Sequence, residues 1–324
     1  MEKNQSGIGD SRAIVVMALY KFVYLPDYTN LKEPLLKKCQ DNNLYGTVLL
    51  AEEGINGALS GSRDGLVNLL NYLQEDERFS NIEFKESTAH QTPFHRMKVK
   101  LKKEIVSMGL DDVQPGIITG TGVEPRDWNN IISDLDVLVI DTRNQYEIDI
   151  GSFKNATSSG TETFSEFPGY VADNLNPDKQ KKIAMYCTGG IRCEKASAYL
   201  LKQGFEEVFQ LNGGILKYLE EVEREDSLWE GECFVFDGRV AVDCELKPGQ
   251  YAQCYACRRP VSPEQMKSGK YEEGVSCPHC FDSLSEKKHA AVTERQKQVK
   301  LAEHRKQLHI GASMPIKKSL NEDW

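Results

Sequence analysis

The chain has 324 residues, a hydrophobic fraction of 40% and a formal net charge of −9. This length is sufficient for two or three domains, and the acidic balance excludes a general polyanion-binding protein but allows a local basic patch. No run of about 18 apolar residues occurs, so we expect neither a membrane span nor a membrane partner. The polar start MEKNQSGIGDSR has no apolar signal core, so we expect a cytoplasmic protein, in which nine cysteines favour metal ligands or reactive thiols over disulfides.

The first hundred residues alternate between strand-like and helix-like segments after a flexible leader at residues 1–12. Strands are expected at Ala13–Leu25, in two runs within Tyr45–Gly61, at Ile82–Ser87 and at Arg96–Gly109. Helices are expected at Leu31–Asn42 and Arg63–Asp76, and Pro34 is acceptable only in a first helical turn. This order predicts a ferredoxin-like α+β domain of the split-βαβ kind over residues 13–110.

A segment rich in Gly, Pro and Thr at residues 111–124 is predicted to be a linker. Beyond it, Asp136–Arg143 and Lys181–Cys187 are apolar runs typical of strands in a buried parallel sheet. Helix-like and strand-like segments then alternate to about residue 226. We therefore predict a doubly wound α/β domain, a parallel sheet flanked by helices, over residues 125–226.

The last third of the chain contains two Cys-x2-Cys pairs separated by 19 residues, Cys254/Cys257 and Cys277/Cys280. Four thiolates at this spacing suit a tetrahedral structural zinc site, which we predict within a cysteine-rich region at 227–283. The alternative is a reduced or disulfide-linked quartet without metal. Residues 284–324 are predicted to be a polar helical tail, either supporting nucleic-acid binding or forming a solvated helix with i,i+4 pairs.

The segment CTGGIR (Cys187–Arg192) carries the strongest catalytic signal. A strand is expected to end at the cysteine and a helix to begin near the arginine. The loop residues between them (Thr188, Gly189, Gly190, Ile191) can then turn their N–H groups inward. These amides, the helix dipole and the guanidinium favour a thiolate, so Cys187 and Arg192 are the catalytic candidates. The alternative is a small buried residue before a tight turn.

The length of this loop and the cysteine after it bear on its chemistry. Cys-x4-Arg is one residue shorter than the loop of phosphatases with a cysteine nucleophile, so it suits a single sulfur- or oxygen-sized adduct. Cys193 follows Arg192 directly and is a candidate to resolve a sulfenic acid or persulfide on Cys187. The alternative is a small residue that faces away from the loop.

The stretch DTRNQYEIDIGSFKNA (Asp141–Ala156), the Cys187 loop and LNGGI together resemble a rhodanese domain. With AEEGINGALSG and PFHRMKVKLKKEIVSMG added, the chain resembles the rhodanese-related tRNA uridine hydroxylase family. The resemblance implies that Cys187 is catalytic. It also implies oxygen-dependent hydroxylation of the tRNA wobble uridine 34 at C5, giving 5-hydroxyuridine, with molecular oxygen as co-substrate. Arg143 and Glu147, four residues apart, are expected to form a structural ion pair.

A tRNA partner, bound through its anticodon region, should leave an electrostatic footprint. Arg96, Lys98, Lys100 and Lys102 alternate with apolar residues, which places four cations on one face of a strand, and Lys103 follows. We predict that these five residues contact phosphates. The alternative is a solvated face of an antiparallel sheet.

The turn AEEGINGALSG offers three substrate-positioning candidates, Glu52, Glu53 and Asn56. Adjacent carboxylates are unusual beside a phosphate-binding surface, which is why a direct role is considered. The alternative is a tight connection in which Gly54 and Asn56-Gly57 supply the turn.

No flavin, haem or nicotinamide motif is found, and the sequence indicates neither the oligomeric state nor the route of dioxygen activation. A sulfurtransferase that carries persulfide sulfur would use the same cysteine, so the loop does not distinguish it from a hydroxylase. A zinc-containing RNA-binding adaptor with an inert rhodanese domain is a further alternative.

Overall fold

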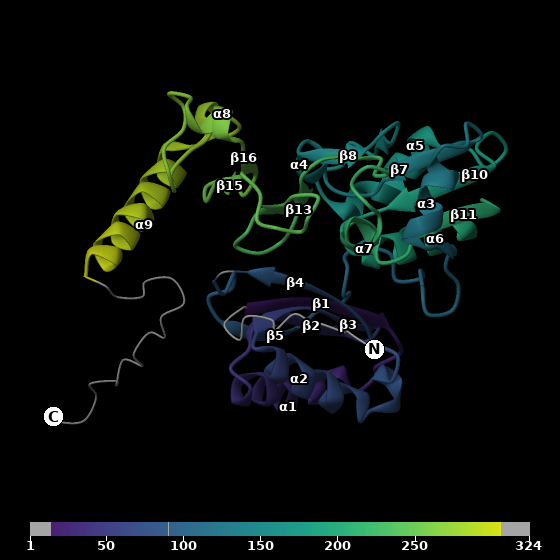
Figure 1. Ribbon diagram of the computed structural model, residues 1–324, viewed down its shortest axis with the longest axis horizontal. Coiled ribbons are helices and arrows are strands. Elements are labelled where there is room, and N and C mark those ends of the chain that lie inside the picture. Colours follow the sequence, from purple (N-terminus) through teal and green to yellow (C-terminus); the bar gives the residue numbers. More distant parts are fainter. Residues whose placement is uncertain (1–13, 90, 306–324) are drawn as a thin grey trace, which may run out of the picture. The chain divides into compact units, whose positions relative to one another are not determined.

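The computed structural model describes residues 14–89 and 91–305 (Figure 1). These residues form two units, divided between Ala252 and Gln253. The predicted leader and the part of the predicted tail beyond residue 305 lie outside the described residues. None of the described helices is both long and apolar enough to cross a membrane.

The first unit begins with a five-stranded sheet in the order β4-β1-β3-β2-β5. Its elements are β1 (Ile14–Phe22), α1 (Tyr28–Asp41), β2 (Tyr45–Ala51), β3 (Gly54–Gly61), α2 (Arg63–Gln74), the 3-10 turn η1 (Glu77–Phe79), β4 (Glu83–Ala89) and β5 (Met97–Leu101). The first four strands pair antiparallel in the ferredoxin-like order, which confirms the predicted fold, and β5 adds a parallel edge beside β2.

Two predicted boundaries in this domain were wrong. Helix α1 begins at Tyr28, so Pro34 lies inside the helix and not in its first turn. The last strand ends at Leu101 and does not reach Gly109. The Glu104 carboxylate accepts the N–H groups of Met108 and Gly109 at 2.9 and 3.0 Å, and this local turn takes the place of strand pairing.

The two faces of the sheet differ in what covers them. One face packs against α1 and α2, which lie together on one side of the strands in Figure 1, and it contributes Met17, Leu50 and Leu59 to the core. The opposite face carries Tyr20, Lys85 and other residues that line a cavity described below. Only one face is therefore used for the hydrophobic core of this domain.

The second sheet of the first unit is parallel and has the order β6-β11-β10-β7-β9. Its elements are β6 (Thr121–Val123), α3 (Pro125–Ile132), β7 (Val137–Asp141), α4 (Gln145–Ile148), β8 (Gly151–Phe153), β9 (Thr157–Ser158), η2 (Phe164–Glu166), α5 (Phe167–Asn174), β10 (Lys182–Tyr186), α6 (Ile191–Lys202), β11 (Glu207–Leu211) and α7 (Gly214–Glu221). β6 lies within the segment for which we predicted a linker.

Helices cover both faces of this sheet, as predicted for a doubly wound domain. One core contains Trp128 of α3 and Tyr218 of α7, while the other contains Phe167 of α5 and Leu200 of α6. Buried on both sides, β10 directs its last residues to the edge of the sheet where the Cys187 loop begins.

The first unit ends with short strands. β12 (Trp229–Gly231) pairs antiparallel with β8, and β13 (Cys233–Phe234) pairs with β14 (Ala241–Val242) to form a hairpin. The hairpin packs onto the domain through Phe234, which stacks edge-to-face on Tyr146 at a centroid distance of 5.3 Å.

The second unit is built around the cysteine pairs. It contains β15 (Ala252–Gln253), which begins one residue before the unit, β16 (Pro260–Val261), α8 (Pro263–Met266), η3 (Phe281–Ser283) and the long α9 (Glu286–His304). Its small core consists of cysteine side chains with Ala256 and Val261, against which Val292 of α9 packs. The predicted fold class, with a cysteine cluster followed by a helix, is confirmed.

Candidate active site and metal centre

The Cys187 loop joins the end of β10 to the start of α6. Gly190 has a φ of 99°, a conformation that favours glycine, and its N–H donates to Cys187 Sγ at 3.1 Å. Cys187 is fully buried by solvent accessibility, but it contributes to the wall of a cavity. The predicted inward-facing amide is thus present in the loop.

Helix α7 stabilises the Cys187 loop through backbone hydrogen bonds. The N–H groups of Ile215 and Leu216 donate to the carbonyls of Cys187 and Thr188 at 2.9 and 3.1 Å. Gly214 has a φ of 66°, and a Cβ at this position would lie 2.5 Å from the Cys187 carbonyl oxygen and 2.8 Å from the Gly189 nitrogen. The second glycine of LNGGI is therefore required by the close approach of two backbones.

Cys193 faces the Cys187 sulfur, so the alternative that it points away was wrong. Its thiol is a hydrogen-bonding neighbour that lowers the pKa of Cys187, its backbone N–H donates to the Gly190 carbonyl at 2.9 Å, and its own sulfur lies 3.6 Å from the Thr142 hydroxyl. Burial and the neighbouring sulfur raise the pKa of Cys193 well above that of a free thiol. Cys193 is therefore held as a proton-bearing donor beside Cys187.

Opposing effects act on the Cys187 thiol. Burial raises its pKa, but the Cys193 hydrogen bond, the positive charge of Arg192 and the Gly190 N–H lower it, and together they bring the pKa below that of a free thiol. The arrangement stabilises an ionised sulfur at neutral pH, and an ionised sulfur is the nucleophilic form.

Arg192 forms its ion pair with Glu147, which differs from the pairing that we predicted. Its guanidinium donates to both Glu147 carboxylate oxygens at 2.7 and 2.8 Å. Arg143 instead pairs with Asp141 at 2.6 Å and gives Glu147 only a hydrogen bond to its backbone carbonyl. The prediction of an Arg143–Glu147 ion pair was wrong because Glu147 lies at the start of α4, where its carboxylate turns back to the Asn144 N–H and across to α6.

A cavity of about 730 Å³ lies between the Cys187 loop and the open face of the first sheet. This size is in the range of ordinary small-molecule sites. Lys85 of β4 donates to the Gly189 carbonyl at 2.9 Å, and the Tyr20 hydroxyl donates to Glu194 at 2.7 Å. Burial lowers the pKa of Lys85. The active-site candidate is thus composite, with side chains from both domains of the first unit.

A buried lysine that we did not predict joins these two domains. Lys195 of α6 donates to Glu53 at 2.7 Å, to Glu104 at 2.5 Å and to the Val106 carbonyl at 3.1 Å. No sequence pattern could indicate this contact, because Lys195 and Glu53 are 142 residues apart. The ion-pair network fixes α6, and with it the Cys187 loop, against the first sheet.

The three substrate-positioning candidates occupy different environments. Glu53 is held by Lys195 and by the Ile105 N–H at 2.6 Å, while the Asn56 amide donates to the Ile105 carbonyl at 2.9 Å. Asn56 also lines the cavity, and Glu52 is exposed away from these contacts. Of the three, only Asn56 contributes to the cavity wall.

The predicted basic residues lie on and beside β5. Lys98 and Lys100 pair in register with Thr47 and Leu49 of β2, both of which line the cavity. Residues paired in register project to the same face of a sheet, so these two lysines extend the cavity wall with positive charge. Arg96, Lys102 and Lys103 are exposed beyond the ends of the strand. The predicted apolar face is incomplete, because Leu101 is exposed.

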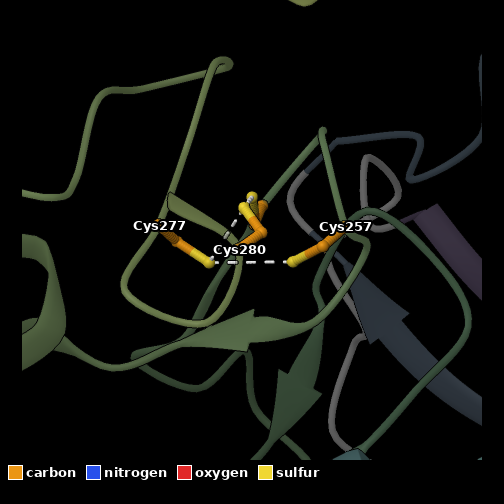
Figure 2. A group of neighbouring side chains, drawn as sticks. Cys257, Cys277 and Cys280 are labelled. Atoms are coloured by element: carbon orange, nitrogen blue, oxygen red, sulfur yellow. Dashed lines mark hydrogen bonds between the residues drawn. The ribbon is translucent and has the colours of Figure 1, made fainter. Parts of the chain in front are cut away.

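The four cysteines of the second unit converge, with all their sulfurs within 4.8 Å of one another. Dashed lines in Figure 2 join Cys277 Sγ to the sulfurs of Cys257 and Cys280, and these two contacts are 3.7 and 3.8 Å long. Four sulfurs at about 2.3 Å from a tetrahedral zinc are about 3.8 Å apart, so the donor set fits zinc. The clustering of the quartet is as predicted.

The described part of the predicted tail is helix α9. Most of its side chains are exposed, as expected for a helix without an apolar stripe, and Arg295 lies 5.1 Å from the centre of the Tyr255 ring.

Two protein families match the chain. The "UPF0176 acylphosphatase like domain" matches residues 14–105, and the "Rhodanese-like domain" matches residues 124–221. The two matches coincide with the two sheets that enclose the cavity.

Solved structures with similar parts include a rhodanese-like domain from Anabaena sp., 17% identical, covering 34% of this chain and 78% of its own, with a TM-score of 0.29. A rhodanese-related protein from Thermoplasma volcanium is 27% identical over 31% of this chain and 92% of its own, with a TM-score of 0.26. An acylphosphatase from Coxiella burnetii is 17% identical over 27% of this chain and 92% of its own, with a TM-score of 0.21.

Proposed function

Since this chain belongs to the UPF0176 rhodanese-related tRNA hydroxylase family, with an acylphosphatase-like domain before a rhodanese-like domain, we propose that it is an enzyme that modifies tRNA. The proposed reaction is oxygen-dependent hydroxylation of the wobble uridine 34 at C5, giving 5-hydroxyuridine. One observation carries the proposal: the stabilised Cys187 sulfur lies on the wall of a cavity whose opposite wall extends into the lysine-bearing face of β5.

The lysine-bearing face of β5 is an argument for a polyanionic substrate. Lys98 and Lys100 share this face, and partial burial together with the positive charges of Arg96 and Lys100 lowers the pKa of Lys98. When closely spaced lysines neutralise phosphates, the counterions condensed on the nucleic acid are released. This release favours nucleic-acid binding even by an acidic protein. The anticodon backbone would lie along β5, and the wobble base would enter the cavity.

The Cys187 thiolate would serve in one of two ways. It can add to C6 of the uracil ring, which makes C5 nucleophilic, or it can carry the oxygen atom as an adduct. Both roles begin from an ionised sulfur, which Arg192, Cys193 and the Gly190 N–H stabilise. Insertion of one oxygen atom from dioxygen into the C5–H bond leaves the second to depart as water, after uptake of two electrons and two protons from a reductant in solution.

Zinc would have a structural role in this enzyme. Cys254, Cys257, Cys277 and Cys280 provide four thiolates, which fill a tetrahedral coordination sphere and leave no position for substrate. Zinc bound there would stabilise the second unit, and no step of the proposed reaction passes through it.

The direct test is nucleoside mass spectrometry of tRNA from a deletion strain complemented with wild type or Cys187→Ala. We expect 5-hydroxyuridine and its derivatives with wild type and their loss with the variant. With a reductant supplied, the purified protein should also form 5-hydroxyuridine on unmodified tRNA in air and not under nitrogen. Unchanged nucleosides in the deletion strain would reject hydroxylation, and full complementation by Cys187→Ala would favour an RNA-binding adaptor.

The basic face can be tested separately. Lys98→Gln and Lys100→Gln should each weaken tRNA binding and reduce the slope of log affinity against log salt by about one. Lys37→Gln on α1 is the matched control, because α1 covers the other face of the sheet. Equal losses in all three variants would show that the effect is only one of net charge.

A second candidate function is sulfur transfer through a persulfide on Cys187. The enclosed loop favours it, since one N–H donor and one thiol converge on a single sulfur and would also hold a sulfur-sized adduct. A steady-state assay with thiosulfate and cyanide decides: turnover that exceeds tRNA hydroxylation by orders of magnitude would favour the transferase.

A further inference from the structure

Phe236 is an exposed aromatic residue at the cavity. Its side chain is 61% exposed, although the preceding residues of the same hairpin, Phe234 and Val235, are 2% and 5% exposed. The ring lines the cavity that contains Cys187, and its centre lies 5.8 Å from the Arg192 guanidinium. A large apolar side chain is therefore kept in solvent beside the reactive loop.

The hairpin holds this ring in place. Arg239 pairs with Asp237 at 2.5 Å and donates to the Ser87 hydroxyl of β4 at 2.7 Å, while the Gly238 N–H donates to the Pro93 carbonyl at 3.0 Å. The Phe236 ring packs edge-on against Phe234, with centroids 5.1 Å apart. The hairpin is thus held by contacts to the first domain, and the ring itself contacts Phe234 and Arg192. Because the ring is already positioned, binding a ligand against it costs little conformational entropy of the protein.

We propose that Phe236 is the stacking platform for the base that enters the cavity, so that it contributes to binding of a flipped uracil ring. The inference rests on the proposed function, because it takes the substrate to be a nucleic acid. An exposed ring offers its π face to a planar, unstacked base, and aromatic side chains are the usual contacts for bases removed from a stack. The Arg192 guanidinium lies beside the ring, and both of its terminal nitrogens donate to Glu147, so these donors are occupied when a base meets the ring.

The other role to be tested is shielding. The ring could cover the buried Arg192–Glu147 pair and act on the Cys187 loop alone. A stacking platform and a shield differ in their response to a base: only the platform distinguishes an RNA with a base from one without it. Phe84 of β4, whose side chain is 44% exposed and is absent from the cavity wall, offers a matched control.

The experiment measures binding of an anticodon stem-loop RNA carrying either uridine or an abasic nucleotide at the wobble position, without oxygen so that no turnover occurs. The full-length wild type and Phe84→Leu should bind the uridine RNA about tenfold more tightly than the abasic RNA. Phe236→Leu should lose this preference, and Phe236→Trp should retain it. The rate of Cys187 alkylation should be equal in all four proteins.

Three outcomes would overturn the stacking role: no preference in wild type, an undiminished preference in Phe236→Leu, or a loss of preference accompanied by slower Cys187 alkylation. The proposed function is judged independently by product formation. A uridine preference that depends on Phe236, in a protein that forms no 5-hydroxyuridine, would reject hydroxylation and support the stacking role.

Discussion

Cys187 lies at the end of β10, with the Gly190 N–H, one neighbouring thiol and the Arg192 charge near its sulfur. In the second unit, the sulfurs of four cysteines lie within 4.8 Å of one another. In the first region, protein donors and a guanidinium stabilise one thiolate, so the sulfur needs no metal and stays free to react. In the second, four thiolates would repel one another, and a bound metal cation would hold them together.

Cys233 shows that burial does not account for this difference. Like Cys187 it is fully buried, yet burial raises its pKa to about 12, because the charge of Arg143 offsets only part of the cost. Hydrogen-bond donors aimed at the sulfur distinguish Cys187 from Cys233. The predictions that follow change the metal, the domain contact, the loop and the donors in turn.

Removal of zinc should have the largest effect. Structural zinc sites contribute about 10–16 kcal/mol of apparent binding free energy, so a strong chelator or Cys277→Ser should unfold the second unit. Limited proteolysis should then cut within residues 253–305, while Cys187 alkylation stays unchanged because its described partners lie in the first unit. Purified protein that holds no zinc, or a cleavage pattern insensitive to the chelator, would contradict the metal assignment.

Lys195→Met should be the most damaging single change in the first unit that we consider. It leaves the Glu53 and Glu104 carboxylates without their cation, at a cost of up to about 3–5 kcal/mol in the free energy of unfolding by denaturant. The pKa of Glu104 is lowered in the folded protein, so its contribution is present above the pKa of the unfolded state and is lost as the pH falls through the folded pKa.

The wild type should therefore lose stability in acid more steeply than Lys195→Met. Lys202→Met, which removes an exposed ion pair on the same helix, is the control and should cost little. Parallel pH profiles for wild type and Lys195→Met would show that the network does not hold the domains.

Gly214→Ala should disturb the loop directly. The new Cβ would meet the Cys187 carbonyl, and the positive φ adds strain, so we expect a loss of about 1–3 kcal/mol and slower Cys187 alkylation at pH 7. Gly204→Ala is the matched control, since Gly204 has a φ of 91° but nothing within 4 Å of the added atom. Equal alkylation rates in the two variants would show that contact with the loop is unimportant.

Cys193→Ala should have the smallest effect. It removes one hydrogen bond to the thiolate, which should raise the pKa of Cys187 by about one unit, and Cys193→Ser should raise it less because a donor remains. The measurement is the midpoint of alkylation rate against pH. An identical midpoint in wild type and Cys193→Ala would show that this thiol is not a donor to the sulfur.

Local patterns were sufficient for the parts of the molecule in which the interacting residues are close in the chain. Spacing alone indicated the anion-stabilising loop at Cys187 and the cluster formed by the two Cys-x2-Cys pairs. The apolar runs at β7 and β10 likewise predicted buried parallel strands. The ferredoxin-like domain followed in the same way from alternating segments.

Contacts between distant residues could not be predicted. Glu147 has Arg143 four residues away, but the fold brings Arg192 to it from 45 residues away. Lys195 and Phe236 belong to no motif, and their positions depend on how the two sheets face each other across the cavity. Spacing along a chain indicates neighbours on one element, but only tertiary packing places side chains from two domains at one site.

The most direct test of the central claim is the pH dependence of Cys187 alkylation by iodoacetamide, followed by peptide mass spectrometry with Cys233 as the internal reference. A free thiol titrates at about 8.5. We predict that the Cys187 rate is already near its plateau at pH 7, whereas Cys233 stays unreactive. A Cys187 rate that rises only above about pH 8.5 would contradict an ionised, reactive sulfur and the function built on it.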